Sequence, residues 1–106
     1  MEWVSGNIFI RPTELPNAGD ITRSHKHNFD HTAIVFTGAV HVEATLPDGT
    51  VREGDFFAPA YFLIKKDVTH KITALADGTV YWCVFSHRTP QGEVIEVWDG
   101  WREATV

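Results

Sequence analysis

The sequence predicts an all-β fold, and two features of the residue pattern lead to that prediction. Turn signals recur about every ten residues, and the segments between them are rich in Val, Ile, Thr and aromatic residues. No stretch carries an apolar repeat of 3.6 residues long enough for a helix. A β-sandwich or β-barrel is therefore expected. Because 106 residues can bury one core, we predict a single domain over residues 1–106.

Seven segments are predicted to be strands. The first covers residues 7–11 and is expected to end at Pro12. Residues 32–37 and 39–46 flank Gly38, and we expect them to form a hairpin. The pair Asp48-Gly49 follows residues 39–46, and the pair Asp77-Gly78 precedes residues 79–86. Both pairs predict turns because glycine tolerates positive φ. The remaining predicted strands are residues 56–57, 61–64, 71–74 and 79–86.

Composition and charge narrow the functional classes. The net charge of −5 offers no basic surface for a phosphate backbone, so nucleic acid is not an expected partner. No apolar stretch approaches the roughly 18 residues of a membrane span. Residues 1–5 lack the pattern of a secretory signal, and Cys83 is the single cysteine. We therefore expect a cytoplasmic protein that binds a small molecule and no membrane.

Three of the six histidines lie within seven residues. His25 and His27 are two residues apart, which on an extended strand puts both side chains on one face, about 6.5 to 7 Å apart. His31 follows a bend at residues 28–30, which can return it to the same face. A single histidine is ordinarily a solvated surface residue. Three in this arrangement instead indicate a metal site.

This stretch resembles the first sequence motif of the cupin superfamily. That motif is Gly, five residues, His-x-His, three or four residues, Glu, six residues and Gly. Here Gly19, His25, His27, His31 and Gly38 reproduce all of these spacings. His31 stands at the position where the family usually has glutamate.

The second cupin motif matches less closely. It is Gly, five residues, Pro-x-Gly, two residues, His, three residues and Asn. It aligns with Pro59, residues 65–67, His70 and Ala74, and only the histidine is identical. The resemblance covers residues 19–74, about half the chain. It implies a single-domain double-stranded β-helix, the jelly-roll barrel of the cupins, in which two antiparallel sheets enclose a metal ion.

The resemblance also implies a ligand set. His25, His27 and His70 take the histidine positions of the family, and His31 takes the glutamate position. Four neutral imidazoles leave the double charge of the ion unneutralised, so the site should favour anionic ligands and the reduced state of a redox metal. Imidazole suits several metals. We expect one divalent transition metal ion, with Fe favoured and Mn, Ni or Zn as alternatives.

Strand alternation predicts which residues line the metal pocket. Residues two apart on a strand share a face, so Ala33 and Val35 should lie on the inward face with His31. By the same argument Ile72 should lie on the inward face with His70. This predicted lining is small and apolar, and it contains no charged side chain that would hold a substrate.

Other polar residues are expected to have ordinary structural roles. His41 and His87 match no ligand position, so we predict surface or strand-end roles for them. Cys83 is predicted to be a small buried hydrophobic residue. Asp55 is predicted to lie in a turn, and so is Asp30, which can alternatively accept a hydrogen bond from a ligating histidine.

Three functions fit these features. Four protein ligands leave two open positions on an octahedral metal, so the resemblance implies a dioxygenase-like enzyme for a small oxygen chelator, such as an enolised diketone or a catechol-like molecule. The second function is a metal-assisted isomerase, epimerase or lyase. It is weakened because the sequence places no acid or base beside the ligands. The third is a non-catalytic small-molecule or metal-binding module. Cupin-like barrels commonly pair, so we also expect a homodimer.

Overall fold

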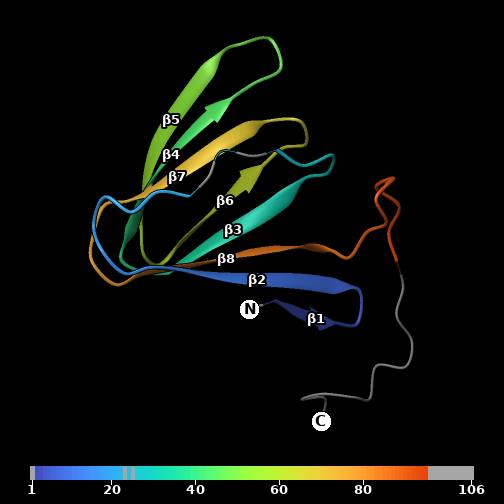
Figure 1. Ribbon diagram of the computed structural model, residues 1–106, viewed down its shortest axis with the longest axis horizontal. Coiled ribbons are helices and arrows are strands. Elements are labelled where there is room, and N and C mark those ends of the chain that lie inside the picture. Colours follow the sequence, from blue (N-terminus) through green and yellow to red (C-terminus); the bar gives the residue numbers. More distant parts are fainter. Residues whose placement is uncertain (1, 23, 25, 96–106) are drawn as a thin grey trace.

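The computed structural model describes residues 2–22, 24 and 26–95 (Figure 1). This part of the chain forms eight β-strands and no helix, so none of its residues belongs to a helix able to cross a membrane. The strands are β1 (Trp3–Ser5), β2 (Ile8–Leu15), β3 (His31–Thr37), β4 (Ala39–Thr45), β5 (Val51–Phe57), β6 (Ala60–Ile64), β7 (Thr69–Ala74) and β8 (Thr79–Ser86).

These strands form two antiparallel sheets. The larger sheet has the order β1-β2-β8-β3-β6, and the smaller one has the order β5-β4-β7. Figure 1 shows the smaller sheet in the upper part of the view and the larger sheet below it. Strands far apart in the sequence, such as β3 and β8, are neighbours, as in a jelly roll. The predicted all-β jelly roll is confirmed, and its two sheets remain separate rather than closing into one barrel.

The core lies between the two sheets. β3 buries every second residue from its start, and β7 buries every second residue from His70. Val35, Val40 and Ile72 are almost completely buried, and each such side chain stabilises the fold by about 1.5 to 3 kcal/mol. The other buried members of the core cluster are Leu15, Ala33, Val42, Phe62, Ile64, Ala74 and Tyr81.

The predicted hairpin across Gly38 is wrong. β3 belongs to the larger sheet and β4 to the smaller one, so these consecutive strands do not pair. Gly38 has a φ of 75°, and a Cβ at this position would lie 2.8 Å from the Cα of Thr79. Glycine allows the chain to turn at this close contact and to pass from one sheet into the other.

Two further predictions about strands are also wrong. β2 continues through Pro12 instead of ending there. Because β1 pairs only as far as Ile10, the second half of β2 is an outer edge, where the missing amide proton of proline costs no ladder hydrogen bond. Asp55 lies within β5, opposite His41, and not in a turn.

The two Asp-Gly turns are found where they were predicted. Asp48 and Gly49 join β4 to β5, which pair as a hairpin, and the amide of Gly49 donates to the carbonyl of Leu46 over 2.9 Å. Asp77 and Gly78 connect β7 to β8 and therefore lead from the smaller sheet to the larger one. Both glycines have positive φ.

Candidate metal centre

His31 and His70 face one another across the two sheets. His31 is the first residue of β3 in the larger sheet, and His70 is the second residue of β7 in the smaller one. Only 2% of His31 and 1% of His70 is exposed. Strand alternation aims both imidazoles into the space between the sheets, and their ring centroids are 5.3 Å apart.

His27 completes a cluster of three histidines. It precedes β3 and belongs to no strand, and the bend predicted at residues 28–30 is present at residues 28 and 29. Its ring centroid lies 4.8 Å from that of His31 and 5.9 Å from that of His70. The possible ligand atoms of the three residues all lie within 4.8 Å of one another.

This spacing fits a shared metal ion. Two nitrogens on opposite sides of one ion, each about 2.1 Å from it, are about 4.2 Å apart. The three imidazoles are thus close to the spacing of bound ligands in a compact, buried setting. His25, the fourth predicted ligand, lies outside the residues that the structure describes.

Two hydrogen bonds hold the His27 segment against the turn that precedes β7. The amide of Asp67 donates to the carbonyl of His27 over 2.7 Å. The amide of Lys66 donates to Oδ1 of Asp30 over 2.8 Å. Asp30 therefore joins the segment of His27 to the turn that leads to His70, which neither of the roles predicted for it included.

A backbone contact orients His70. Its Nδ1 lies 3.2 Å from the carbonyl oxygen of Val68. Because a carbonyl oxygen only accepts, Nδ1 is the protonated nitrogen, and Nε2 keeps its lone pair. A supporting hydrogen bond of this kind fixes the tautomer and the ring orientation of metal-binding histidines.

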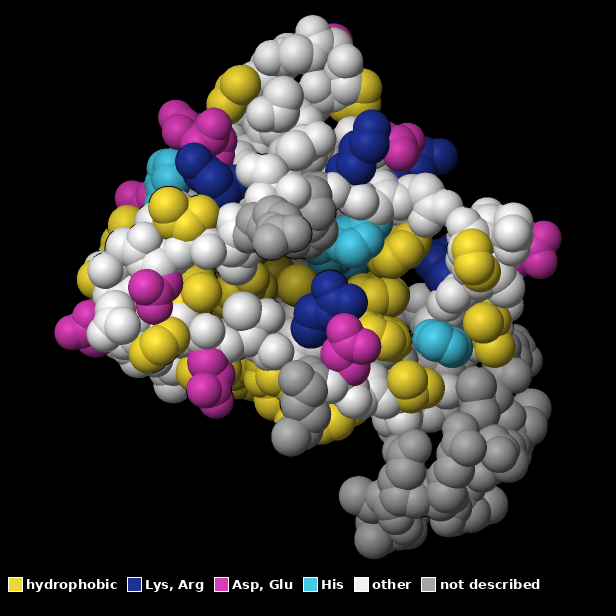
Figure 2. Space-filling view, viewed as in Figure 1, with side chains coloured by type: hydrophobic (Ala, Val, Ile, Leu, Met, Phe, Trp, Pro, Cys, Tyr) yellow, Lys and Arg dark blue, Asp and Glu magenta, His cyan; other side chains and the backbone are white. Residues whose placement is uncertain are grey.

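Phenylalanine rings border the cluster on one side. Phe29 and Phe85 pack with ring centroids 4.7 Å apart, and Phe29 stacks on His27 at 5.0 Å. Figure 2 shows histidine side chains in a hollow near the middle of one face, next to hydrophobic side chains. An apolar border strengthens electrostatic interactions inside the site because it keeps water away.

The other two histidines lie outside the cluster, as predicted. His41 is on the outer face of the smaller sheet, with Nδ1 2.6 Å from Oδ1 of Asp55 and Nε2 3.3 Å from Oε1 of Glu53. The hydrogen bond to Asp55, followed by that to Glu53, raises the pKa of His41 above its ordinary value. His87 stacks on Phe9 just after β8, with ring centroids 6.0 Å apart.

A cavity of about 200 Å³ opens beside His27, on the side of β2 and β8. Ala33, Val35 and Ile72 lie on the inward faces of their strands with His31 and His70, as alternation predicted, and belong to the buried core cluster. Their role in lining a metal pocket stays a prediction. The described residues that line this cavity are Arg11, Thr13, Thr22, His27, Tyr81, Cys83 and Phe85. The lining of this cavity thus combines polar side chains with aromatic ones.

Burial controls the ionisation of two groups in this lining. It raises the pKa of the Tyr81 phenol to about 12, against the smaller opposite effect of hydrogen bonds with Thr13 and Thr22. It raises the pKa of the Cys83 thiol to about 11. Both groups are neutral at pH 7, so Tyr81 is a hydrogen-bond donor and Cys83 is not a nucleophile.

Sequence reasoning missed the contribution of β2 to this cavity. Arg11 and Thr13 are two residues apart on β2, and Tyr81 and Cys83 are two residues apart on β8. The register pairs Arg11 with Cys83 and Thr13 with Tyr81, so all four share one face. Alternation within each strand was a usable signal, but the pairing of β2 with β8 was not visible in the sequence.

Comparison with known proteins adds information on the fold. No protein-family model matches the sequence, and no curated protein matches it significantly. Among solved structures, a variant of oxalate decarboxylase from Bacillus subtilis has a TM-score of 0.72 and 21% identity, covering 85% of this chain and 24% of that chain. The formate complex of oxalate decarboxylase from Lactobacillus farciminis has a TM-score of 0.70 and 24% identity, covering 78% of this chain and 24% of that one.

A third similar structure is of a protein that contains a transition metal. It is a Bacillus subtilis oxalate decarboxylase described for the EPR fine-structure parameters of its Mn(II) centres, with a TM-score of 0.72 and 21% identity over 88% of this chain and 25% of that chain. The present chain thus spans about a quarter of the length of the structures it matches. Because oxalate decarboxylases are cupins, the chain has the cupin fold, and the predicted resemblance is confirmed at that level.

Proposed function

We propose that the chain binds one divalent transition metal ion on His27, His31 and His70, with His25 as the fourth ligand. The observation that carries this proposal is the convergence of possible ligand atoms from residues 27–31 and from β7 within 4.8 Å of one another. The hydrogen bond from Nδ1 of His70 to Val68 supports it, because it makes Nδ1 the protonated nitrogen and Nε2 the one that carries a lone pair. Imidazole nitrogen suits several transition metals.

We infer further that the bound ion is iron and that the protein is a dioxygenase-like enzyme. When bound, Fe(II) supplies a Lewis acid with open positions and a redox function. Imidazole ligands add no negative charge, which favours an anionic oxygen chelator such as an enolised diketone or a catecholate. The described lining of the cavity beside His27 contains no carboxylate to act as a general base, which favours this chemistry over proton transfer.

The residues around the cavity have tasks in this proposal. Tyr81, neutral at pH 7, donates a hydrogen bond to a substrate oxygen. Arg11 attracts the anion, although its guanidinium also pairs with Glu2 over 2.9 Å. Phe29 and Phe85 exclude water from the ligand side of the cluster. A small substrate fits the cavity volume of about 200 Å³.

A second candidate is a manganese-dependent lyase. The observation that favours it is the similarity to oxalate decarboxylase, whose Bacillus subtilis form has Mn(II) centres. The same three histidines and the same cavity would then hold manganese and a small dicarboxylate. The two candidates differ in whether turnover requires dioxygen. A non-catalytic binding module, the third possibility from the sequence, predicts ligand binding without turnover.

We also propose that the protein is a cytoplasmic homodimer. Its pairing surface is the outer face of the larger sheet, where Ile34 pairs with both Tyr61 and Trp82 in the strand register. Tyr61 is 76% exposed and Leu63 57% exposed on the same face. Contiguous exposed apolar residues of this kind mark association surfaces. The cytoplasmic location rests on Cys83, which forms no disulfide.

Metal analysis tests the site. Purified protein should contain close to one transition metal ion per chain by inductively coupled plasma mass spectrometry. His70→Ala should remove that ion, because it deletes a buried ligand, whereas His87→Ala should leave it in place. Full metal retention in His70→Ala would contradict the proposed ligand set.

Metal-specific assays separate the two enzymatic candidates. Protein loaded with Fe(II) under argon should develop a visible charge-transfer band with 2,4-pentanedione and should consume oxygen when air is admitted. Protein loaded with Mn(II) should release no carbon dioxide from oxalate. The reverse pattern would support the lyase and overturn the dioxygenase. Tight binding of the diketone without turnover under either condition would support the binding module.

A further inference from the structure

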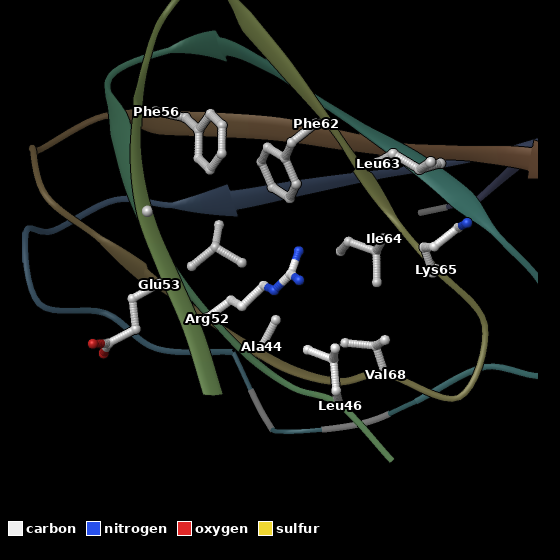
Figure 3. Close-up of a pocket in the computed structure, with 12 residues that line it drawn as sticks. Ala44, Leu46, Arg52, Glu53, Phe56, Phe62, Leu63, Ile64, Lys65 and Val68 are labelled. Atoms are coloured by element: carbon white, nitrogen blue, oxygen red, sulfur yellow. The ribbon is translucent and has the colours of Figure 1, made fainter. Parts of the chain in front are cut away.

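A second cavity lies between β5 and β6, and the proposed metal chemistry does not use it (Figure 3). Its volume is about 270 Å³. It is separate from the cavity beside His27, with which it shares no described lining residue. Most of its side chains are apolar, among them Val42, Ala44, Phe56, Phe62, Ile64 and Val68.

A missing side chain creates this space. Arg52, Gly54 and Phe56 alternate along β5, so they share one face of the strand, and Gly54 lies opposite Val42 in the ladder. Phe56 and Phe62 stack with ring centroids 4.5 Å apart and form one wall. Gly54 does not have positive φ, so its backbone does not require glycine. The glycine therefore leaves room between the arginine and the aromatic wall.

Arg52 contributes a positive charge to a mostly apolar cavity, whose other charged lining residues are Glu53 and Lys65. Figure 3 shows its side chain running into the cavity, while Glu53 points away. Glu53 instead contacts His41 on the outer face. Among the described residues, no side chain forms a hydrogen bond or an ion pair with Arg52. Its guanidinium is therefore available to a ligand.

We propose that this cavity binds a small amphipathic carboxylate, with its apolar body on the aromatic wall and its carboxylate on Arg52. An apolar cavity of about 150 Å³ holds a benzene molecule, so a volume of about 270 Å³ accommodates a ring with a short side chain. A guanidinium pairs with a carboxylate through two parallel hydrogen bonds. Mostly apolar lining with a few placed polar groups is the usual composition of a small-molecule site.

The position of this cavity relates it to the histidine cluster. Ala44 is the ladder partner of His70, and Ile64 is the ladder partner of His31. A ligand on the β5 and β6 side therefore contacts the neighbours of two proposed metal ligands without occupying the cavity beside His27. Binding itself does not depend on a metal.

Isothermal titration of metal-free protein with 3-phenylpropanoate tests the proposal. EDTA-treated wild-type protein should bind one molecule per chain, and 3-phenylpropan-1-ol, which lacks the charge, should bind more weakly. Arg52→Gln should weaken phenylpropanoate binding about 10-fold, the effect of losing a charged hydrogen bond. Gly54→Val should abolish it, because the new side chain fills the cavity. Lys71→Gln, which removes a surface cation that lies 3.5 Å from Glu43, is the matched control and should bind normally.

The outcomes separate this proposal from the metal site. Arg52 is exposed, so Arg52→Gln is expected to fold. Unchanged affinity of that variant for phenylpropanoate would overturn the proposal, whether or not Gly54→Val folds. The proposal would also be overturned if the wild-type protein failed to bind phenylpropanoate at about 5 mM, a concentration that detects even weak binding. Metal content should be normal in both variants. Purified wild-type protein that contains no metal would contradict the proposed metal site but not the proposed carboxylate site.

Discussion

His31 is the residue at which the chain departs from the usual cupin ligand pattern. The family places a carboxylate there, whereas here a buried imidazole at the start of β3 faces His70 and His27. A neutral ligand leaves more positive charge on the ion than a carboxylate does. The choice of residue at this position therefore bears on which anions the site accepts.

Substitution of His31 should separate a ligand from a bystander. His31→Ala should lower metal affinity about 10- to 100-fold, a range measured even for the loss of supporting contacts around a metal. His31→Glu should keep the metal but bind azide more weakly, because the carboxylate neutralises part of the charge. Competition with a chelator gives the affinity, and azide titration of the metal-loaded protein gives the anion effect. Unchanged affinity in His31→Ala would withdraw the charge argument.

His41 should make stability depend on pH. Its pKa is raised in the folded protein, first by the hydrogen bond to Asp55 and then by that to Glu53. A raised folded pKa means that the stabilisation is fully present below the unfolded value of about 6.5 and is lost as pH rises through the folded pKa. The stability advantage of wild type over His41→Gln should therefore be larger at about pH 5.5, where the ring is charged, than at about pH 9, where it is neutral.

Urea unfolding at both pH values measures this difference, and the imidazole shifts of His41 in NMR give its pKa directly. The same comparison with His87→Gln is a control, because His87 stacks on Phe9 and no carboxylate contact with it is described. An advantage over His41→Gln that stays constant across the range would show that the two carboxylates do not stabilise the charged ring.

At the scale of single elements, the connection between β3 and β4 depends on Gly38. Alanine there would place its Cβ 2.8 Å from the Cα of Thr79, in a backbone conformation that already disfavours a side chain. Gly38→Ala should therefore lower the free energy of unfolding by about 2 to 5 kcal/mol, the sum of left-handed strain and overpacking. Gly49→Ala is the matched control. It also has positive φ but nothing within 4 Å, so it should cost only about 1 to 2 kcal/mol.

The turn before β7 depends on Asp67 in a similar way. Asp67 has a φ of 62°, and it occupies the position at which the second cupin motif has glycine. Aspartate tolerates this conformation better than most residues, whereas a β-branched residue does not. Asp67→Val should lower the free energy of unfolding by about 1 to 2 kcal/mol, and Asp67→Gly should have little effect. Urea unfolding measures both, and equal losses would contradict this explanation.

At the scale of the whole molecule, the outer face of the larger sheet is the expected dimer surface. Trp82 packs there against both Trp3 and Phe36, with ring centroids 5.2 Å and 4.5 Å apart, respectively. All but Trp82 belong to the exposed large hydrophobic residues. A rigid aromatic surface of this kind contributes to binding with little loss of side-chain entropy.

Sedimentation should therefore show a species of about twice 11.9 kDa. Replacing Tyr61 and Leu63 together by Glu should yield the monomer, because two charges would be buried at the interface. Phe57→Glu is the control, since Phe57 is 67% exposed but belongs to the smaller sheet. A single 11.9 kDa species for the wild type would refute the homodimer.

Much of the fold was predictable because strand formation is a local property. The predicted strands at residues 61–64 and 79–86 agree with β6 and β8 to within one residue. Pairing was not predictable, since alternation identifies the face of a strand but not its neighbour. The hairpin across Gly38 failed for this reason. Pro12 was misjudged because the sequence does not reveal which strands are edges.

The sequence by itself determined the all-β class, the positions of most strands and the spacing of the histidines, because these depend on residues close together along the chain. Only the tertiary structure decided that His27, His31 and His70 converge, that Asp67 adopts the conformation of a glycine, and that Gly54 leaves a cavity beside Arg52. Each of these depends on which distant segments pack together. That packing is set by the burial of side chains between two sheets, which local patterns do not encode.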